Sequence, residues 1–249
     1  IYTATPYSLF SLQTTDQSID RFSRVNGLNE TGISSIAYDP ATEKLLIAYN
    51  NSNIDILHRL DVFNIPDLKR DNIIGDKTIY HIYPLNGQFY LSTGLGIVVA
   101  DGSRYEIKDS WFIGNNGNQV KVTGFTSDGS FYYAATAEGL KRAAINGPNP
   151  ANYVNWQLIS GINGLPAGSV QQVVTVQNKI ILLKNDSLYV QSGNNWSFLY
   201  RDGWNINSMN IAENRILLCE RQGNTGRVQV LQPDGTVFRS TPAAIGSLP

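Results

Sequence analysis

The chain has 249 residues, with 19 basic against 20 acidic side chains and a formal net charge of −1. A hydrophobic content of 42%, with 10% aromatic residues, is ample for a packed core and excludes wholesale disorder. The nearly balanced charges give no electrostatic footprint for nucleic acid or an anionic membrane, so neither is expected as a partner.

The apolar runs are too short to cross a membrane. The longest, such as LLIAY from Leu45 and GIVVA from Gly96, have four to six residues, so we expect no membrane span and no secretory signal within this chain. A signal could have preceded Ile1 and been removed, which leaves the compartment open. The single cysteine, Cys219, excludes an internal disulfide, and its neighbours in RILLCE predict a buried side chain.

A short apolar run recurs along the chain. The differences between the residue numbers at which it starts are 44, 44, 42, 49 and 36. A tight loop follows each run, and then a small or polar residue precedes an apolar one, as in Asn53-Ile54 and Gly96-Ile97. Such residues suit a turn that needs positive φ before the chain re-enters a strand. The runs start at Ile1, Leu45, Phe89, Phe131, Ile180 and Ile216.

A second sequence motif, Asn-Gly-Leu, fits the same repeat length. Asn-Gly-Leu occurs at Asn26 and again at Asn163, 137 residues later (163 − 26), which is close to three repeats. In both places it precedes alternating Ile or Val and polar positions. We therefore place it in the connection into the first strand of a unit.

Each unit contains four predicted strands. In the second unit they are ISSIAYD, KLLIAYN, NIDILHR and DVFNI, and no window of helical length shows a sustained i, i+3, i+4 apolar pattern. Four strands about every 40 residues predict an all-β fold, a β-propeller of four-stranded antiparallel blades. The six apolar runs then start the second strands of six blades.

The number of blades in the intact ring has two interpretations. Nothing precedes Ile1 to serve as the first strand of the first unit, and the tail from Thr241 is the only candidate to close the ring, although its two prolines make it a poor strand. Either the tail closes a six-bladed ring, or the six repeats are part of a seven-bladed one. We expect residues 1–249 to form a single propeller domain, a fragment of a longer multidomain protein.

The first 120 residues resemble a specific family. The stretches ATPYSLFSL, FSRVNGLNETGISSIAYDP, LLIAYNNSNIDIL, NIPDLKRDNIIGDKTIYHIY and FYLSTGLGIVVADGSRYEIKDSWFIG are similar to the N-terminal propeller of the PorZ family. That family belongs to the type IX (Por) secretion system of Bacteroidetes. From about Val120 onward the likeness is only to propellers in general.

The resemblance implies an extracytoplasmic protein held at the outer-membrane surface. There the family works with a sortase-like protease and a barrel partner that attach secreted proteins to anionic lipopolysaccharide. The implied role of the propeller is binding and delivery without catalysis, with protein partners or a lipopolysaccharide-type glycan as ligand. The phrase from Asn163 also resembles the periplasmic sensor propellers of hybrid two-component regulators, which recognise oligosaccharides, and this is the alternative function.

No set of residues predicts catalysis, a metal site or a cofactor. His58 and His81 are 23 positions apart and have no cysteine or paired histidine beside them. No Gly-x-Ser-x-Gly elbow is present for a serine nucleophile. Glu106 and Asp109 have a spacing that would place them on opposite faces of a strand, so we do not expect them to work as an acid–base pair.

The predicted binding residues lie in loops. Connections between blades and turns between second and third strands emerge on the same face of a propeller, and here they are DLKRDNIIGDK, WFIGNNGNQ, RDGWN and RQGNTG. Cations in these loops could meet an anionic or phosphorylated sugar, and two tryptophans could stack on it, although tryptophans capping blade cores and solvated cations are the simpler interpretation. The candidate residues are Lys69, Arg70, Lys77, Trp111, Arg201, Trp204 and Arg221.

Overall fold

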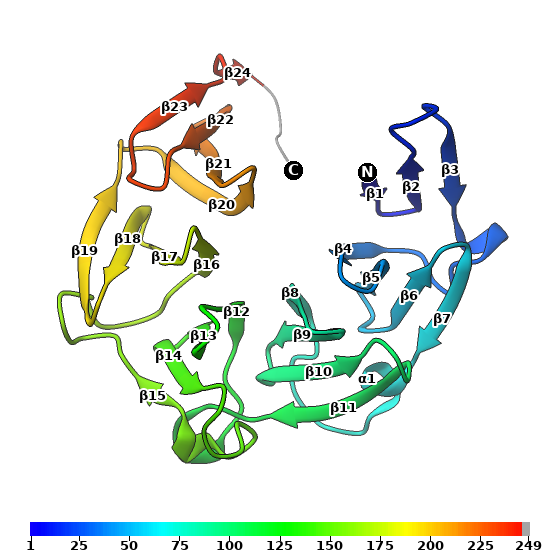
Figure 1. Cartoon of the computed structure of the whole chain (residues 1–249), viewed down its shortest axis with the longest axis horizontal. Coiled ribbons are helices and arrows are strands. Elements are labelled where there is room, and N and C mark those ends of the chain that lie inside the picture. Colours follow the sequence, from blue (N-terminus) through cyan, green and yellow to red (C-terminus); the bar gives the residue numbers. More distant parts are fainter. Residues whose placement is uncertain (246–249) are drawn as a thin grey trace. The chain divides into compact units, whose positions relative to one another are not determined.

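The computed structural model describes residues 1–245. It divides into two compact units, residues 1–122 and the chain from Thr123 onward. Each unit holds three antiparallel sheets, and Figure 1 shows their strands in sequence colours. The single domain over residues 1–249 that the sequence predicts stays a prediction.

The first unit contains one three-stranded and two four-stranded sheets. Its helical turns are η1 (Arg24–Asn26), α1 (Asp67–Arg70) and η2 (Asn115–Gly117). Its strands are β1 (Tyr2–Thr5), β2 (Ser8–Leu12) and β3 (Ile19–Phe22); β4 (Ile33–Asp39), β5 (Lys44–Tyr49), β6 (Ile54–His58) and β7 (Asp61–Ile65); and β8 (Ile79–Leu85), β9 (Gln88–Thr93), β10 (Ile97–Asp101) and β11 (Glu106–Trp111).

The second unit repeats the same up-and-down order. The helical turn η3 (Tyr153–Asn155) precedes β15. The strands are β12 (Val122–Ser127), β13 (Phe131–Thr136), β14 (Gly139–Ala144) and β15 (Gln157–Leu158); β16 (Gln172–Val176), β17 (Lys179–Lys184), β18 (Ser187–Ser192) and β19 (Asn195–Tyr200); and β20 (Asn205–Ala212), β21 (Arg215–Gln222), β22 (Thr225–Leu231), β23 (Val237–Ser240) and β24 (Ala244–Ile245).

These sheets are the six blades of a β-propeller, which confirms the predicted fold class. The predicted second strands are confirmed in the last five blades, where the apolar runs lie in β5, β9, β13, β17 and β21. The sheet of the first blade has the order β1-β2-β3, and β1 begins at Tyr2, one residue after the predicted Ile1. The period of short apolar runs therefore located the blades correctly.

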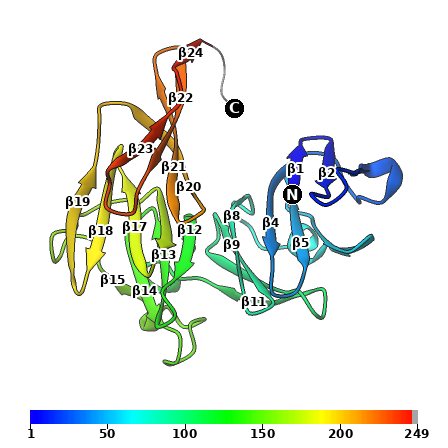
Figure 2. The same cartoon turned by 45° about the horizontal axis from the view of Figure 1, so that its top comes forward.

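The tail from Thr241 pairs differently from the ring-closing strand that was one interpretation of the sequence. Its described part, β24, pairs with β22 of its own unit, with Ala244 opposite Gly226 and Ile245 opposite Thr225 (Figure 2). Thr241 directs the chain there, because its hydroxyl accepts a hydrogen bond from Val228 N at 2.8 Å. Residues 246–249, including Pro249, lie outside the described residues.

The inner strands form the cores. All six residues of β5 are buried, as expected of a strand that is covered on both faces. Leu46, Ile56, Leu91 and Val98 belong to one cluster that joins the two four-stranded sheets of the first unit. In the second unit, alternation along β21 buries Leu218 and Glu220.

Cys219 is therefore not buried as predicted. Its side chain is half-exposed, because the residues of β21 alternate between the two faces of the sheet. The apolar letters around Cys219 suggested a strand covered on both faces, but β21 alternates. The next residue along the strand, Glu220, is the buried one, with 1% exposure.

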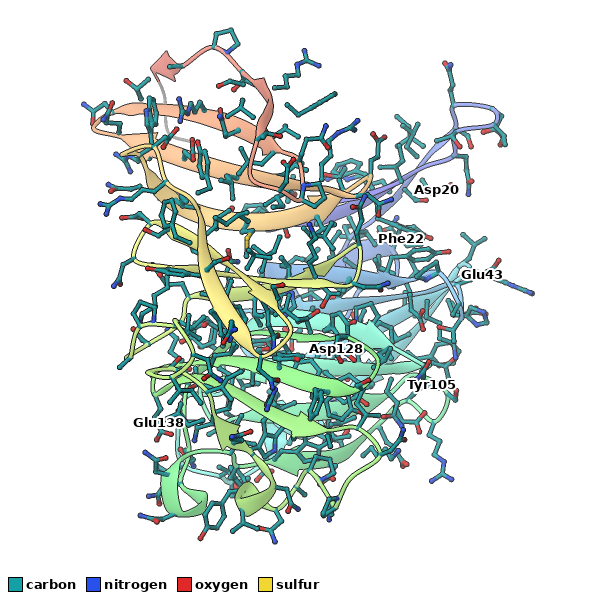
Figure 3. The ribbon with its side chains drawn as sticks, turned by 60° about the vertical axis from the view of Figure 1, so that its left-hand side comes forward. Asp20, Phe22, Glu43, Tyr105, Asp128 and Glu138 are labelled. Carbon is teal, nitrogen blue, oxygen red and sulfur yellow. The ribbon has the colours of Figure 1, made fainter. Side chains whose placement is uncertain are left out.

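Antiparallel pairing gives every four-stranded sheet two different ends. At one end the first strand turns into the second and the third into the fourth, and we name this the turn end. At the other, the loop end, the second strand turns into the third and the connections between sheets begin or arrive. Asp128 in the β12–β13 turn and Glu138 in the β13–β14 turn mark the two ends of β13 in Figure 3.

Candidate functional site

The three candidate cations of the first unit lie in the connection from β7 to β8. Leu68 of α1 is buried and fixes this short helix against its sheet, and Lys69 and Arg70 close the helix. Lys77 lies in the same connection, just before β8. These three cations therefore share the loop end of the first unit, as the sequence predicts.

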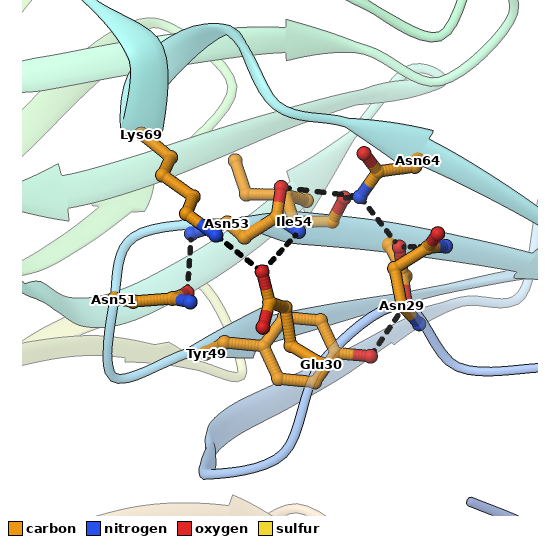
Figure 4. A network of polar contacts seen from close by, with 9 residues as sticks. Asn29, Glu30, Tyr49, Asn51, Asn53, Ile54, Asn64 and Lys69 are labelled. Carbon is orange, nitrogen blue, oxygen red and sulfur yellow. Dashed lines mark hydrogen bonds and ion pairs between the residues drawn. The ribbon is translucent and has the colours of Figure 1, made fainter. Parts of the chain in front are cut away.

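Asp55 organises the loop end of the sheet β4–β7. Its side chain is 0% exposed and accepts four hydrogen bonds, drawn in part in Figure 4. Asn29, in the connection from β3 to β4, donates its backbone N–H and its Nδ2 at 2.9 Å each. Tyr49 donates its hydroxyl at 2.5 Å, and Asn64 donates Nδ2 at 2.9 Å. Asp55 thus ties the incoming connection to β5 and β7 through neutral donors.

The hydroxyl of Tyr49 remains a donor over the whole working pH range. Burial raises the pKa of Tyr49, and the hydrogen bond to Asp55 and its negative charge raise this pKa further. The arrangement is therefore rigid and already saturated. It supports the loop end rather than offering a free carboxylate to a ligand.

Lys69 is held beside this network. It forms an ion pair with Glu30, and this hydrogen bond is the main reason that the pKa of the Glu30 carboxyl is lowered. Asn53 donates a further, longer hydrogen bond to Glu30, at 3.4 Å. The charge of Lys69 is therefore largely neutralised by the chain itself, although its side chain is 41% exposed.

The charges of Arg70 and Lys77 are not neutralised by an acidic side chain of the described residues. Arg70 is exposed, and its side chain has no ion pair within residues 1–245. The ammonium of Lys77 donates to the backbone carbonyl of Asp71, a neutral acceptor, while its own carbonyl accepts from Ser52 Oγ at 2.9 Å. These contacts fix the loop without cancelling the charge.

Trp111 does not present a stacking surface. Its side chain is 5% exposed, its ring lies against Tyr90 with the ring centroids 5.6 Å apart, and its Nε1 donates to Asp109 at 2.8 Å. The sequence-based prediction that a sugar stacks on Trp111 is therefore at odds with its burial at the end of β11. It caps the blade core, which was the simpler interpretation.

The candidate residues of the second unit gather near a cluster that we name the Arg227 cluster: Tyr200, Asp202, Trp204, Glu220 and Arg227. Arg227 donates Nε to Glu220 at 2.7 Å, forms an ion pair with Asp202, and lies over the Trp204 ring with Cζ 4.2 Å from its centroid. Tyr200 donates its hydroxyl to Asp202 at 2.7 Å. The cluster joins the β21–β22 hairpin to the connection from β19 to β20.

The pKa values of the two acids in the Arg227 cluster are shifted in opposite directions. Burial raises the pKa of Glu220, and the hydrogen bond from Arg227 offsets this only in part. One of its oxygens, Oε1, is shielded from solvent and has no hydrogen-bond partner within the described residues. The pKa of Asp202 is lowered instead, because the donors Tyr200 and Trp204 N and the charge of Arg227 together outweigh burial.

Solvent exposure differs among the three candidate residues of the second unit, Arg201, Trp204 and Arg221. Arg201 is exposed and has no ion pair in the part of the chain that the structure describes. Arg221 is exposed and donates Nε to the carbonyl of Gly223 at 2.7 Å, which leaves its charge uncompensated. Trp204 is half-buried, and Arg227 covers one face of its ring.

The loop end of the first unit also contains a hollow of about 520 Å³. Phe112, Gly117, Asn118 and Gln119 line it, all from the connection between β11 and β12 that the sequence singled out. Gln119 ties this connection to the preceding one by donating Nε2 to Ile74 O at 2.9 Å. Ile74 itself is 92% exposed.

Within residues 1–245, no group of three or more His, Cys, Asp or Glu side chains is placed to hold a metal ion. His81 lies in β8, where burial lowers its pKa to about 4, so it is neutral at pH 7. No helix among the described residues has the length and apolar character needed to cross a membrane.

Sequence reasoning missed the Arg227 cluster. A signal was available: the two-residue loop Gly223-Asn224 sets the hairpin register and places Glu220 opposite Arg227. The burial of Glu220 also follows from counting two residues on from Leu218. The contacts of Arg227 with Asp202 and with Trp204 need the three-dimensional structure.

Comparison with known proteins identifies the family. The model of the N-terminal β-propeller domain of PorZ, a component of the type IX secretion system, matches residues 1–157, more than half of the chain. The chain belongs to the PorZ N-terminal β-propeller family. This confirms the resemblance inferred from the first 120 residues and extends it through the fourth blade. No curated protein matches the chain.

Solved structures support the fold. PorZ of Porphyromonas gingivalis, described as an essential bacterial surface component of the type IX secretion system, is similar over 99% of this chain, with a TM-score of 0.73 and 24% identity. The chain spans 37% of the length of that protein.

Two extracellular domains from B. thetaiotaomicron proteins named as hybrid two-component systems are also similar, each with a TM-score of 0.62. Their identities are 12% and 13%; they cover 85% and 88% of this chain, which spans 28% and 31% of theirs. At these identities the likenesses show the fold alone.

Proposed function

We propose that this chain is a non-catalytic binding domain of a type IX secretion component, held at the outer-membrane surface, which assists the attachment of secreted proteins to anionic lipopolysaccharide. The observation that carries the proposal is the family match over residues 1–157. Its ligand is either a protein partner of the attachment complex or a lipopolysaccharide-type glycan. The loop ends are the surfaces through which it binds, since propeller loops vary freely on a rigid scaffold.

The charges at the loop ends favour an anionic ligand. Arg70 and Lys77 of the first unit, and Arg201 and Arg221 of the second, carry charges that no acidic side chain of the described residues neutralises. Charge-assisted hydrogen bonds from such groups to phosphate or uronate are worth about 1.5–3 kcal/mol each. Lys69, paired with Glu30, and the buried Trp111 contribute to the scaffold instead.

The test measures binding of purified anionic lipopolysaccharide to the chain and to two double variants, one for each unit. They are Arg70→Ala with Lys77→Gln, and Arg201→Ala with Arg221→Ala. Loss of two charged contacts weakens binding at least tenfold, since about 1.4 kcal/mol corresponds to a factor of ten. Arg104→Ala, which removes a 76% exposed cation at the turn end, is the matched control and leaves the affinity unchanged.

Equal affinity of both double variants and the original chain would remove these residues as the lipopolysaccharide site. The family assignment would still stand, and the proposal would then rest on a protein partner. The alternative function, oligosaccharide sensing in a two-component regulator, is supported by the fold likeness to the B. thetaiotaomicron domains. The gene sequence downstream of Pro249 separates the two: a second propeller and a small β-sandwich favour secretion, and a transmembrane helix with a kinase favours sensing.

A further inference from the structure

A small pocket of about 200 Å³ lies at the turn end of the second unit. It opens between the sheet β12–β15 and the sheet β16–β19, at the opposite end of their strands from the loops discussed above. Its lining is mostly polar, and this volume is below the range of about 300–1,000 Å³ that drug-sized sites occupy. The side chains that matter for the argument are Asp128, Phe131, Arg142, Asn178, Gln191 and Asn194.

Asp128 is held rigidly at the rim. Its Oδ1 accepts hydrogen bonds from Ser130 N at 2.8 Å and Phe131 N at 2.7 Å, and its Oδ2 accepts from the Tyr133 hydroxyl at 2.8 Å. Burial and the hydrogen bond to Asp128 raise the pKa of Tyr133 to about 12, so this hydroxyl stays protonated. A carboxylate has about four acceptor positions, so one remains for an incoming hydroxyl.

Arg142 balances the charge of Asp128. Its guanidinium lies over the Phe131 ring, with Cζ 4.9 Å from the centroid, and its Nε donates to Gln157 at 3.2 Å. These two contacts fix the plane of the guanidinium. The lining therefore carries one anion and one cation, and a ligand with a net charge has no advantage over a neutral one.

Amide groups complete the pocket from the next sheet. Asn178 occupies the turn between β16 and β17, and Asn194 the turn between β18 and β19. Gln191 donates Nε2 to Gly193 O at 3.0 Å, while its Oε1 is shielded from solvent and has no hydrogen-bond partner within the described residues. Because that oxygen is closed to solvent, the amides open to an incoming ligand are those of Asn178 and Asn194.

The pocket is not a general consequence of two neighbouring blades. In the first unit, Lys44 of β5 donates Nζ to Gly102 O at 2.6 Å, and its Nζ lies 5.0 Å from the centroid of the Tyr105 ring. Tyr105 in turn stacks on Phe63, with centroids 3.9 Å apart. The turn that carries Tyr105 spans Gly102–Tyr105, whereas the corresponding turn of the second unit is only Gly193-Asn194. The shorter turn lacks a side chain that would fill the space.

We propose that this pocket binds a single neutral sugar ring. Fixed carboxylate, guanidinium and amide groups can pair with neighbouring hydroxyls of such a ring, and the Phe131 side chain offers it an apolar contact. The balanced charges distinguish this site from the cationic loop ends, and the proposal does not depend on the function proposed above. It assigns a binding role to the lining residues at the turn end, from Asp128 in one sheet to Asn194 in the next.

The test uses the whole chain and a panel of neutral methyl glycosides of glucose, galactose, mannose and N-acetylglucosamine. Two-dimensional NMR of the side-chain amides follows each titration. One member of the panel shifts the amide signals of Asn178 and Gln191 with a millimolar dissociation constant, corresponding to about −4 kcal/mol. Asn178→Gly weakens this binding tenfold or more. Glycine retains the positive φ of 61° at this turn, so the variant keeps the fold.

Asn185→Gly is the matched control. It makes the same change in an exposed turn with a φ of 48°, at the loop end of the same sheet, and leaves sugar binding unchanged. The proposal is overturned if no member of the panel binds, or if Asn178→Gly binds as well as the original chain. Stronger binding of glucuronate, or of free glutamate, than of every neutral glycoside would also overturn it, because the pocket would then select a charged ligand.

Discussion

Two buried carboxylates lie at the loop ends of different sheets, Asp55 of β6 with 0% exposure and Glu220 of β21 with 1%. Each ties the connection that enters its sheet to the hairpin between the second and third strands. Asp55 does so with four hydrogen bonds from neutral donors and no cation. Glu220 does so through one cation, Arg227, which it shares with Asp202, and one of its own oxygens has no partner within the described residues.

The difference shows two ways to hold a negative charge away from water. Amide and hydroxyl dipoles saturate Asp55, which leaves this carboxylate with no capacity for another donor. The Arg227 cluster is incompletely satisfied, since the desolvation of Glu220 is not fully offset. We therefore expect the first arrangement to be the more stabilising one and the second to be the more sensitive to pH and to changes in its surroundings.

Asp55→Ala has the largest expected effect. It leaves the buried hydroxyl of Tyr49 without an acceptor, at about 1–3 kcal/mol. It also removes two hydrogen bonds from the exposed Asn29 and one from Asn64, at about 1 kcal/mol each, while Asn64 keeps its acceptors on Asn53 and Ile54. We expect the free energy of unfolding of the first unit to fall by about 4 kcal/mol or more. Urea denaturation measures the loss, and hydrogen exchange at Asn29 and along β6 locates it.

Asp61→Ala is the control for this experiment. Asp61 is an exposed carboxylate at the start of β7 in the same sheet, and we expect a change within about 0.5 kcal/mol. If Asp55→Ala were as mild as Asp61→Ala, the saturated network would not be what holds the loop end together.

Arg227→Met has the next largest effect. Methionine retains much of the volume of the side chain but removes the one donor to Glu220 among the described residues, and the partner of Asp202. Removing one member of a buried pair costs about 3–5 kcal/mol, and the 16% exposure of Arg227 reduces this to about 3 kcal/mol. Unfolding at pH 7 measures it.

The double variant Arg227→Met with Glu220→Gln tests the cause. A neutral amide at position 220 no longer needs a cation, so we expect the double variant to recover a large part of the lost stability. A double variant that is less stable than Arg227→Met would show that packing, rather than the unpaired charge of Glu220, explains the loss.

Glu220→Gln has a smaller effect whose size depends on pH. Because the pKa of Glu220 in the folded chain is raised, the folded state holds this proton more tightly than the unfolded state. The resulting stability is fully present below the ordinary pKa of a glutamate and is lost as the pH rises through the raised value. The variant lacks this contribution, so its stability relative to the original chain increases between about pH 4.5 and pH 7.

Unfolding curves at several pH values measure this difference. Each unit by which the pKa is raised corresponds to about 1.4 kcal/mol. Glu213→Gln is the control, since that side chain is 86% exposed and no burial acts on its charge. A constant difference between Glu220→Gln and the original chain over this range would contradict the expected pH dependence.

The sequence predicted the scaffold better than the contacts. The recurring apolar runs located five second strands, because inner strands are rich in apolar residues, continuously so where both faces are covered, as in β5. The loops that carry Arg70, Arg201 and Arg221 were also placed correctly, since antiparallel strands fix which turns share an end. Which cations are neutralised was not predictable, because Lys69 meets Glu30 across 39 positions of the chain.

Strand β11 shows the limit of reading faces from alternation. The pairing of β10 with β11 shifts register between Val99 and Ala100, so the residues of β11 do not alternate regularly. Such a bulge changes which side chains turn inward, and the letters EIKDSW give no sign of it. Glu106 and Asp109, which their spacing predicted on opposite faces, pair with Asp101 and Val99 and therefore lie on the same face.

Trp204→Leu has the smallest expected effect and separates the charges of the Arg227 cluster from its aromatic contact. The guanidinium of Arg227 lies 4.2 Å from the Trp204 centroid, and a cation over an aromatic face contributes about 0.5–1 kcal/mol at exposed sites. We expect Trp204→Leu to lower the free energy of unfolding by about this amount and Trp204→Phe by less, as measured by circular dichroism in urea. The same substitution in the Arg227→Met background costs less, because the cation is absent. Equal losses in the two backgrounds would mean that Trp204 contributes packing alone and that the two carboxylates suffice to position Arg227.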